Sequence, residues 1–417
     1  MTATLQSALY RAPAIDTPAR VAAGTPGRLV VPGVESPEWG FEQERALGFF
    51  GAPVDAAAFL AELELSGLRG RGGAGFPAYR KWASVAGPGD SVVVANGHEG
   101  EPASSKDAWL LTRRPYLVLD GLLLAAAVTG SKEAVVYASA PEVVASVQRA
   151  IAEIVTAGLV PEGVTLRVHQ GPPGYVAGEE SAVVQCLNGW PAKPTSKPPR
   201  PFEVGVRGLP TLVSNVETLA HAAWIRRYGA AEFATVGSAS SRGTSLFTIT
   251  GQVGEPGVYE MSLGSTMAEL VSAAGGARGP MAAALIGGWF NGVAVGDHSA
   301  LECCYDAMRA AGTGLGCAAI TVLGPDDDLL AVAEELSGWF AMESAHQCGS
   351  CFTGTKAIAR AFRQALAGND VSRQIADLSR WGSELTGRGV CGFIDSAAAL
   401  ARAGAVEIER RNARREP

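Results

Sequence analysis

Gly67–Trp82, GLRGRGGAGFPAYRKW, is a glycine-rich stretch whose residue types suit the binding of a phosphorylated ligand. Glycine lacks a Cβ atom, so this backbone can adopt positive φ angles and approach a ligand closely. Successive amides in such a loop form an anion site, and Arg69 and Arg71 add donors for phosphate oxygens. A mobile surface loop is the alternative, but neighbouring Phe76 and Pro77 are not typical of a flexible linker. The stretch therefore predicts a loop that cradles a phosphate and a ring system.

Two further stretches place carboxylates where α/β proteins bind ligands. The turn NGHEGEP at 96–102 follows Ser91–Asn96, an apolar run that predicts a buried strand. Open α/β sheets bind ligands at the carboxyl ends of their strands, which is where this turn lies. The loop GPPGYVAGEES at 171–181 leads into a helix with Glu179 and Glu180 in its first turn. Simple complementation of the helix dipole is the alternative interpretation of this second pair.

The composition indicates a globular protein and excludes some classes of function. Hydrophobic residues make up 47% and charged residues 18%, and 417 residues are enough for about two to four domains. A net charge of -7 does not favour a nucleic-acid surface. The longest uncharged run, 279–296, is interrupted by glycine and proline and predicts two short strands rather than a membrane span. Seven cysteines without a secretory signal pattern favour a reducing, cytoplasmic compartment, where paired thiols more often bind metal.

The order of strand and helix signals predicts an α/β fold in four parts. We expect residues 1–40 to form an extended arm, and residues 41–235 to form an α/β domain with an at least partly parallel sheet. Within it we expect one long helix over about 106–128, and another that starts in PTLVSNVETL at 210–219 with Ser214 or Asn215 as its cap. Residues 243–325 predict a small β-grasp-like domain that opens with a hairpin, and 327–417 a helical bundle with three cysteines.

Six motifs, taken together, resemble the flavoprotein (NADH-oxidising) subunit of respiratory complex I and its relatives in NAD-linked hydrogenases and formate dehydrogenases. They are GRGGAGFP at 70–77, EGEP with KD at 99–107, GYVAGEES at 174–181, KPP at 197–199, SNVETLA at 214–220 and ESAHQCGSC at 343–351. The resemblance covers about 41–404. It implies a Rossmann-like FMN-binding domain, then a ubiquitin-like β-grasp domain, then a small helical bundle with an iron–sulfur cluster.

The resemblance also implies an activity and a set of site residues. NADH would reduce FMN, and electrons would leave one at a time through the cluster. The cofactor carries out this chemistry, and the protein holds the cofactor in position. Residues expected to line the FMN are Gly70, Arg71, Gly72, Lys81, Asn96, Glu99, Tyr175, Glu179, Asn215 and Thr218. Residues expected to face the nucleotide are Gly73, Phe76, Glu101, Glu180 and Lys197, with Glu101 and Glu180 the candidate catalytic pair.

Three departures from the family pattern affect the expected flavin and nucleotide contacts. His98 stands where the family usually has Asp, and Ser214 where it has Asn. Arg200 replaces the phenylalanine that follows KPP and stacks on adenine. A guanidinium can stack on a base or pair with a 2′-phosphate, which would favour NADPH. The Glu180 carboxylate repels such a phosphate, so NADH is the expected substrate.

The fourth departure leaves the cluster motif one cysteine short. The family uses C-x2-C-x2-C plus a distant cysteine, and here Ala345 takes the first position, leaving Cys348, Cys351 and Cys391. His346 is the expected substitute ligand of a 4Fe-4S cluster, with a 3Fe-4S form or no cluster as alternatives. A redox dithiol and a zinc site are the other interpretations of this set.

The sequence therefore predicts an FMN-dependent NADH dehydrogenase module that passes electrons to a partner iron–sulfur protein or ferredoxin. We expect no nucleic-acid partner and no direct membrane span. The alternative, motivated by the four departures, is a scaffold subunit that has kept the fold and lost the reaction and the cluster.

Overall fold

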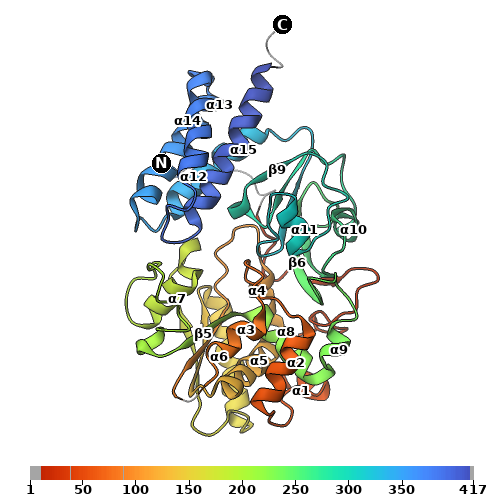
Figure 1. The fold of residues 1–417 in the computed structure, drawn as a ribbon. Coiled ribbons are helices and arrows are strands. Elements are labelled where there is room, and N and C mark those ends of the chain that lie inside the picture. The colour runs from red at the N-terminus through yellow and green to blue at the C-terminus, as the bar shows by residue number, and fades with distance from the viewer. Residues whose placement is uncertain (1–10, 38, 88, 414–417) are drawn as a thin grey trace.

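The computed structural model describes residues 11–37, 39–87 and 89–413. Figure 1 shows a lower α/β layer structure, a second sheet at the upper right, and a group of helices, coloured blue, at the upper left. Among the described helices, none is long and apolar enough to cross a membrane.

The first sheet has four parallel strands in the order β4-β3-β2-β5. The strands are β2 (Val92–Asn96), β3 (Glu133–Ala138), β4 (Thr165–Gln170) and β5 (Thr211–Asn215). Their pairing brings Asn96 opposite both Tyr137 and Asn215, so the carboxyl ends of β2, β3 and β5 meet at one edge. This edge carries the candidate site.

Helices cover both faces of this sheet because successive β2 residues point to opposite sides. Val93 and Ala95 join a core with α5 (Pro115–Thr129), α6 (Pro141–Thr156) and α8 (Val216–Tyr228). Val92 and Val94 pack instead against Val183 of α7 (Glu180–Leu187). The smaller helices of this part are α1 (Phe41–Ala46), α2 (Ala56–Ser66), α3 (Ala78–Ala83), α4 (Lys106–Arg113) and α9 (Ala230–Phe233).

One expected helix is divided in the structure, and another is preceded by a strand that was not predicted. The expected long helix is two helices, α4 and α5, because Pro115 begins α5 and the preceding Arg114 takes a non-helical conformation. Arg114 is fully buried there and pairs with Glu44 at 2.5 Å. The expected helix start within 210–219 is confirmed, since α8 begins at Val216, but the strand Thr211–Asn215 that precedes it was not predicted. Asn215 is the helix cap, one of the two expected candidates.

The second sheet has six strands in the order β1-β7-β6-β10-β8-β9. The hairpin of β6 (Thr244–Gly251) and β7 (Gly257–Ser262) is antiparallel, as expected from its alternating pattern. The other strands are β1 (Arg20–Val21), β8 (Ala283–Ile286), β9 (Val293–Val295) and β10 (Ala319–Leu323), with helices α10 (Met267–Ala273) and α11 (Tyr305–Ala310) beside them.

Part of the expected N-terminal arm belongs to this second sheet, and residues 1–10 lie outside the described residues. β1 pairs in parallel with β7. The buried Glu260 carboxylate on β7 accepts hydrogen bonds from the backbone amides of Arg28, Leu29 and Val30. A carboxylate that satisfies three backbone donors fixes the path of the arm across the domain.

The last part of the chain is helical, with α12 (Leu329–Glu343), α13 (Lys356–Leu366), α14 (Val371–Glu384) and α15 (Phe393–Ala413). A π-helical turn, η5 (Ser350–Thr355), runs directly into α13. Trp339, Phe340, Phe362 and Phe393 are buried in the shared core of this group.

Candidate functional site

A cavity of about 580 Å³ lies at the carboxyl edge of the four-stranded sheet, and loops between strands of the six-stranded sheet contribute to its wall. Its wall combines the glycine loop, the two carboxylate turns, β5 with the start of α8, and loops of the second sheet. Expected site residues in this wall are Gly70, Gly72, Gly73, Phe76, Lys81, Asn96, Glu99, Glu101, Tyr175, Glu179, Glu180, Asn215 and Thr218. Arg71 and Lys197 do not line the cavity.

The glycine loop is a tight turn held by its own backbone and by α8. The amide of Gly70 donates to the carbonyl of Phe76 at 2.8 Å, and the amide of Arg71 donates to Thr218 Oγ1 at 2.8 Å. The guanidinium of Arg71 faces away from the cavity, where it donates to the carbonyls of Thr244 and Arg69. The role expected for Arg71 is therefore changed: it anchors the loop between the two sheets, while the loop backbone forms the wall.

Two glycines leave room that a side chain would fill. A Cβ on Gly72 would lie 3.1 Å from the Cβ of Asn215, and Gly73 has a φ of 122°. Asn215 itself is fixed, because it caps α8 and donates from Nδ2 to Asp107 Oδ2 at 2.7 Å. This backbone cradle is what a planar ring or a phosphate group needs in order to approach closely.

Below the cradle lies a buried group of charges that the motifs only partly indicated. Lys106 Nζ pairs with Asp107 at 2.7 Å and with Glu217 at 2.8 Å. Burial opposes the charge of Lys106, but these two carboxylates outweigh it and raise its pKa above the ordinary value. Glu99 accepts hydrogen bonds from Ser104 Oγ at 2.5 Å and from the amide of Ala108 at 2.9 Å. Burial and the nearby Asp107 raise the pKa of Glu99 to about 7.

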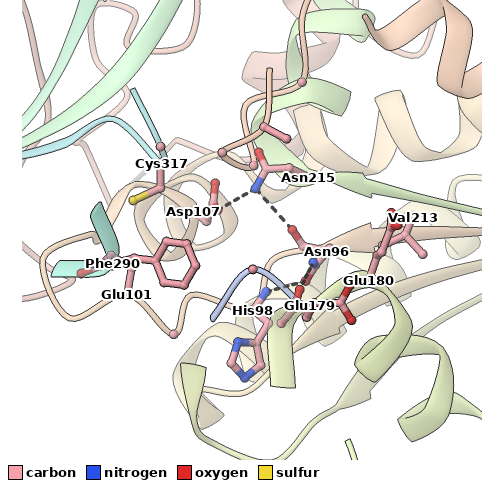
Figure 2. A pocket seen from close by; sticks show the side chains of 18 of the residues that line it. Asn96, His98, Glu101, Asp107, Glu179, Glu180, Val213, Asn215, Phe290 and Cys317 are labelled. Atoms are coloured by element: carbon pink, nitrogen blue, oxygen red, sulfur yellow. Dashed lines mark hydrogen bonds between the residues drawn. The ribbon is translucent and has the colours of Figure 1, made fainter. Parts of the chain in front are cut away.

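Glu101 ties the two sheets together at the cavity. Its Oε1 accepts from the backbone amides of Trp289 at 2.9 Å and Ala103 at 3.2 Å, and its Oε2 accepts from the amide of Phe290 at 3.2 Å. Burial raises its pKa to about 7 despite these hydrogen bonds. Glu101 lies beside Phe290 in the cavity wall (Figure 2).

Glu179 and Glu180 differ in what they contact. Glu179 Oε2 accepts from the amides of Ser181 at 2.9 Å and Ala182 at 3.2 Å, so it caps α7, as the helix-dipole interpretation predicted. Glu180 pairs with Lys81 at 3.1 Å and with Lys197 at 3.5 Å, and Lys197 also pairs with Glu179. Burial raises the pKa of Glu180, but Lys81 and Lys197 outweigh it and lower the pKa below its usual value. Glu180 is thus held as a carboxylate at the cavity.

The sequence did not predict the part of the wall that comes from the second sheet. Phe290 stacks on Tyr175 with ring centroids 4.9 Å apart, and Cys317 also lies in the wall. The run Gly287-Gly288 and the glycines Gly314 and Gly316 mark close backbone approach there. Those glycines were the only feature of the sequence that pointed to this part of the wall. They do not indicate which other residues they approach.

The residues that depart from the family pattern are spread around the site. His98 and Ser214 are both buried, and both line the cavity. The His98 ring points away from Phe290 and Glu101 (Figure 2) and stacks on Tyr137 with centroids 5.8 Å apart. Burial lowers the pKa of His98. Arg200 is exposed, and it does not line the cavity.

Three cysteines meet beside the cavity. Cys348, Cys351 and Cys391 line a second hollow of about 10 Å³, together with Ala345, Gln347 and Phe393. Val176, Cys391 and Phe393 line both this hollow and the large cavity, so the two spaces share part of their wall. His346 is exposed and turned to the edge of Phe352 at 5.3 Å, so the structure does not bring it to the three thiols.

The residues present fit FMN and nucleotide, and fit an iron–sulfur cluster at three of four positions. The cavity volume lies within the roughly 300–1,000 Å³ of small-molecule sites, and the glycine cradle supplies backbone amides beside charged side chains. Three cysteine side chains line the hollow where a cluster with four thiolate ligands would bind, and Ala345 stands at the fourth position. Among the described residues, no three His, Cys, Asp or Glu side chains are arranged to hold a single metal ion, as the zinc interpretation would require.

An α/β domain with a ligand cradle at the strand ends, joined to a cysteine-bearing helical group, defines a class of redox flavoprotein. Comparison with known families agrees. Residues 63–224 match the Nuo51 FMN-binding domain, 331–407 the iron–sulfur binding region of NADH-ubiquinone oxidoreductase F, and 246–287 the SLBB domain.

Individual proteins give the same result. The F subunit of NADH-quinone oxidoreductase of Rickettsia felis is 32% identical over 381 residues, 84% of this chain and 88% of that protein. An F subunit of the same enzyme in Rhizobium meliloti is 32% identical over 81% of each chain. A chain of an NAD+-reducing [NiFe]-hydrogenase in the air-oxidized state superposes with a TM-score of 0.78 at 29% identity, covering 93% of this chain and 68% of that one. This chain belongs to the family of NADH-quinone oxidoreductase F subunits.

Proposed function

We propose that this chain oxidises NADH with FMN bound in the large cavity and passes electrons through the neighbouring cysteine hollow. Membership of the family makes it an NADH dehydrogenase-type oxidoreductase with an FMN-binding domain and an iron–sulfur binding region. The single observation that supports the proposed path is the shared wall: Cys391 and Phe393 face both the cavity and the hollow.

The proposed division into domains follows the elements. Residues 41–235 would form the Rossmann-like FMN/NADH-binding domain, 243–325 a β-grasp domain and 327–417 the iron–sulfur bundle, with 1–40 as an arm. The four-stranded parallel sheet, the six-stranded mixed sheet and the four helices support these bounds. The cavity would then belong to both sheet domains.

The proposed roles of the side chains follow from their contacts. When bound, FMN accepts a hydride equivalent and releases electrons singly. The backbone of 70–75, with Asn96, Asn215 and Thr218, would hold the flavin group against the sheet edge. Lys81 lies at the same wall and would meet phosphate as well as Glu180. Tyr175 and Phe290 would exclude water from the face between the two sheets, because their stacked rings close the cavity there.

Glu180 and Lys197 would set the choice of nucleotide. Glu180 remains charged because Lys81 and Lys197 stabilise its carboxylate, and a charged carboxylate at the ribose repels a 2′-phosphate. The exposed half of Phe76, which is 52% accessible, offers an aromatic face for a base. NADH is therefore the proposed substrate, and Arg200 is placed outside the cavity wall.

The partner in this proposal is another redox polypeptide. The hydrogenase neighbour and the quinone oxidoreductase relatives are named as parts of multi-component redox enzymes, which supports a role as a peripheral electron-input component. The specific acceptor is proposed to be an iron–sulfur protein or ferredoxin.

Anaerobic purification followed by flavin, iron and sulfide analysis tests the proposal. We expect one FMN per chain together with iron and sulfide. A colourless protein that takes up no FMN on incubation would support the scaffold alternative instead. Flavin without iron would restrict the proposal to direct electron delivery from the flavin.

A further inference from the structure

One tyrosine beside the second sheet reaches the glycine loop without lining the cavity. Tyr305 begins α11 and is 5% exposed, and its hydroxyl donates to the carbonyl of Gly70 at 2.7 Å. Burial raises the pKa of Tyr305, so the hydroxyl keeps the proton that it donates. Because Tyr305 is not part of the cavity wall, it can influence a bound ligand only through the loop.

The Tyr305 ring also contacts the other end of the loop. A Cβ on Gly75 would lie 2.5 Å from the Tyr305 ring, so the loop backbone packs directly on this ring. Gly75 has a φ of 61°, a left-handed conformation that glycine adopts without strain. Tyr305 therefore contacts both Gly70 and Gly75, the two ends of the segment whose backbone forms part of the cavity wall.

Arg69 adds a second connection between the loop and α11. Its guanidinium lies 4.7 Å from the centroid of the Tyr305 ring, and its Nε donates to the carbonyl of Gly75 at 2.7 Å. The guanidinium also pairs with Asp306, the next residue of α11, at 3.3 Å. Two consecutive residues of α11 thus hold the carbonyls at both ends of the loop, Tyr305 directly and Asp306 through Arg69.

The peptide unit between Gly70 and Arg71 is held at both of its polar groups. Its carbonyl accepts from Tyr305, and its amide, that of Arg71, donates to Thr218 Oγ1 at 2.8 Å. Thr218 belongs to α8, which covers the first sheet, whereas Tyr305 belongs to α11 beside the second sheet (Figure 1). This peptide unit cannot rotate without breaking a hydrogen bond, and a buried polar group that loses its partner is costly. The orientation of the loop backbone therefore depends on Tyr305.

We propose that Tyr305 is a positioning residue that holds the glycine loop in the conformation that binds the flavin, so that FMN affinity depends on the contact between α11 and the loop. This rests on the proposed function, which places FMN at this loop. The coupling is reciprocal, because a flavin that binds only the held loop also stabilises the contact with α11.

Tyr305→Phe tests the proposal, because it removes the hydroxyl and keeps the ring. Tyr259→Phe is the matched control. Tyr259 is also buried, lies on β7 of the second sheet and donates its hydroxyl to the carbonyl of Glu255 at 2.7 Å. Neither Tyr259 nor Glu255 lines the cavity. Both variants lose one hydrogen bond from a tyrosine hydroxyl to a backbone carbonyl, so a general loss of stability would affect them alike.

The first measurement is FMN titration of the full-length proteins after removal of flavin, followed by flavin fluorescence. Tyr305→Phe should bind FMN about tenfold more weakly than wild type, the size expected for the loss of one largely buried hydrogen bond. Asp306→Asn should weaken binding in the same direction but by less, because Asp306 is partly exposed. Tyr259→Phe should bind FMN as wild type does. Equal FMN affinity in Tyr305→Phe and Tyr259→Phe would overturn the proposal.

Flavin reduction by NADH at saturating FMN distinguishes positioning from a direct part in the reaction. Tyr305→Phe should regain the wild-type rate once the flavin is bound, because Tyr305 lies outside the cavity wall. A rate that stays low at full FMN occupancy would contradict a role in positioning the loop alone.

Hydrogen exchange of the loop amides at 69–76, measured without flavin, separates this proposal from the proposed function. Tyr305→Phe should speed exchange of the Arg71 amide, because the peptide unit is then held at one end only, and Tyr259→Phe should not. Exchange at the wild-type rate in Tyr305→Phe would overturn the proposal. Wild type that binds no FMN, while Tyr305→Phe still speeds exchange, would refute the proposed function and leave Tyr305 as the residue that positions the loop.

Discussion

At the scale of single residues, the site depends on positions where small residues leave space and on a side chain that stays charged. In the glycine loop a Cβ at Gly75 would collide with Tyr305 and one at Gly72 would crowd Asn215, and Glu180 provides a carboxylate kept ionised by two lysines. The cysteine hollow lacks one thiol because Ala345 occupies its wall. Each of these three features leads to a substitution with a defined outcome.

Gly72→Val should weaken FMN binding by about tenfold or more, because overpacking costs roughly 1–3 kcal/mol and a Cβ here already meets Asn215. Flavin retained after gel filtration measures the effect. Gly279→Val is the control, since its Cβ would meet nothing within 4 Å. Full FMN content in the Gly72 variant would place the flavin elsewhere.

Glu180→Gln should reduce the preference for NADH over NADPH. It removes a charge that repels a 2′-phosphate and leaves Lys81 without its carboxylate partner, while Lys197 keeps its pairing with Glu179. The ratio of kcat/KM values for the two nucleotides measures this, with exposed Glu142→Gln on α6 as the control. An unchanged ratio would show that Glu180 does not face the ribose. A wild type that already prefers NADPH would point to Arg200.

Ala345→Cys should raise iron and sulfide content toward that of a 4Fe-4S cluster, because it adds the missing thiolate to the wall of the hollow. A changed paramagnetic resonance spectrum and a lower reduction potential should accompany it. Cys351→Ala should remove the iron. If all three proteins, including the wild type, contain no iron, the cluster has been lost from this chain. His346→Ala should leave iron content unchanged, since His346 is exposed and apart from the thiols.

At the scale of elements, α8 connects the flavin edge to a buried charge group. Asn215 caps its first turn, and Glu217 pairs with Lys106 of α4. His221, one turn further along the helix, is fully buried. Burial, which outweighs the attraction of Glu217, lowers the pKa of His221 to about 4. The helix therefore carries a histidine that must be neutral in the folded protein.

His221 makes stability depend on pH in a defined direction. Its folded pKa lies below the unfolded value of roughly 6.5, so the unfolded chain binds more protons and stability falls as pH drops through that range. His221→Phe should remove this loss, amounting to about 2 kcal/mol near pH 5 and nothing near pH 8. Urea unfolding of both proteins across this range measures it, with exposed His346→Phe as control. Parallel pH profiles for wild type and the His221 variant would contradict the account.

Much of the element structure could be predicted from local patterns, and the exceptions have physical reasons. The apolar run before Asn96 predicts β2, and alternation predicts the β6–β7 hairpin. The strand Thr211–Asn215 resembles a helix start in the sequence because its five residues run directly into the cap of α8. Pro115 itself accounts for the break between α4 and α5. The long apolar run after Pro115 nevertheless favours one continuous helix when the sequence is considered alone.

At the scale of the whole molecule, the cavity exists only because distant parts of the chain meet. Glu101 holds the amides of Trp289 and Phe290, and Glu343 of α12 accepts the amide of Tyr175 at 2.8 Å. Motifs predicted the residues of the lower wall, since the glycine loop and the turns after predicted strands carry recognisable local patterns. The upper wall could not be predicted, because Phe290 and Cys317 are placed by tertiary packing of the second sheet and carry no local signal.

The central claim is that the cavity holds a flavin which NADH reduces directly. Anaerobic stopped-flow mixing of the FMN-loaded protein with NADH tests it most directly, followed by the visible flavin absorbance. NADH should bleach the flavin rapidly, and NADPH should bleach it much more slowly. A protein that retains full FMN, yet shows no change in flavin absorbance with saturating NADH, would contradict it.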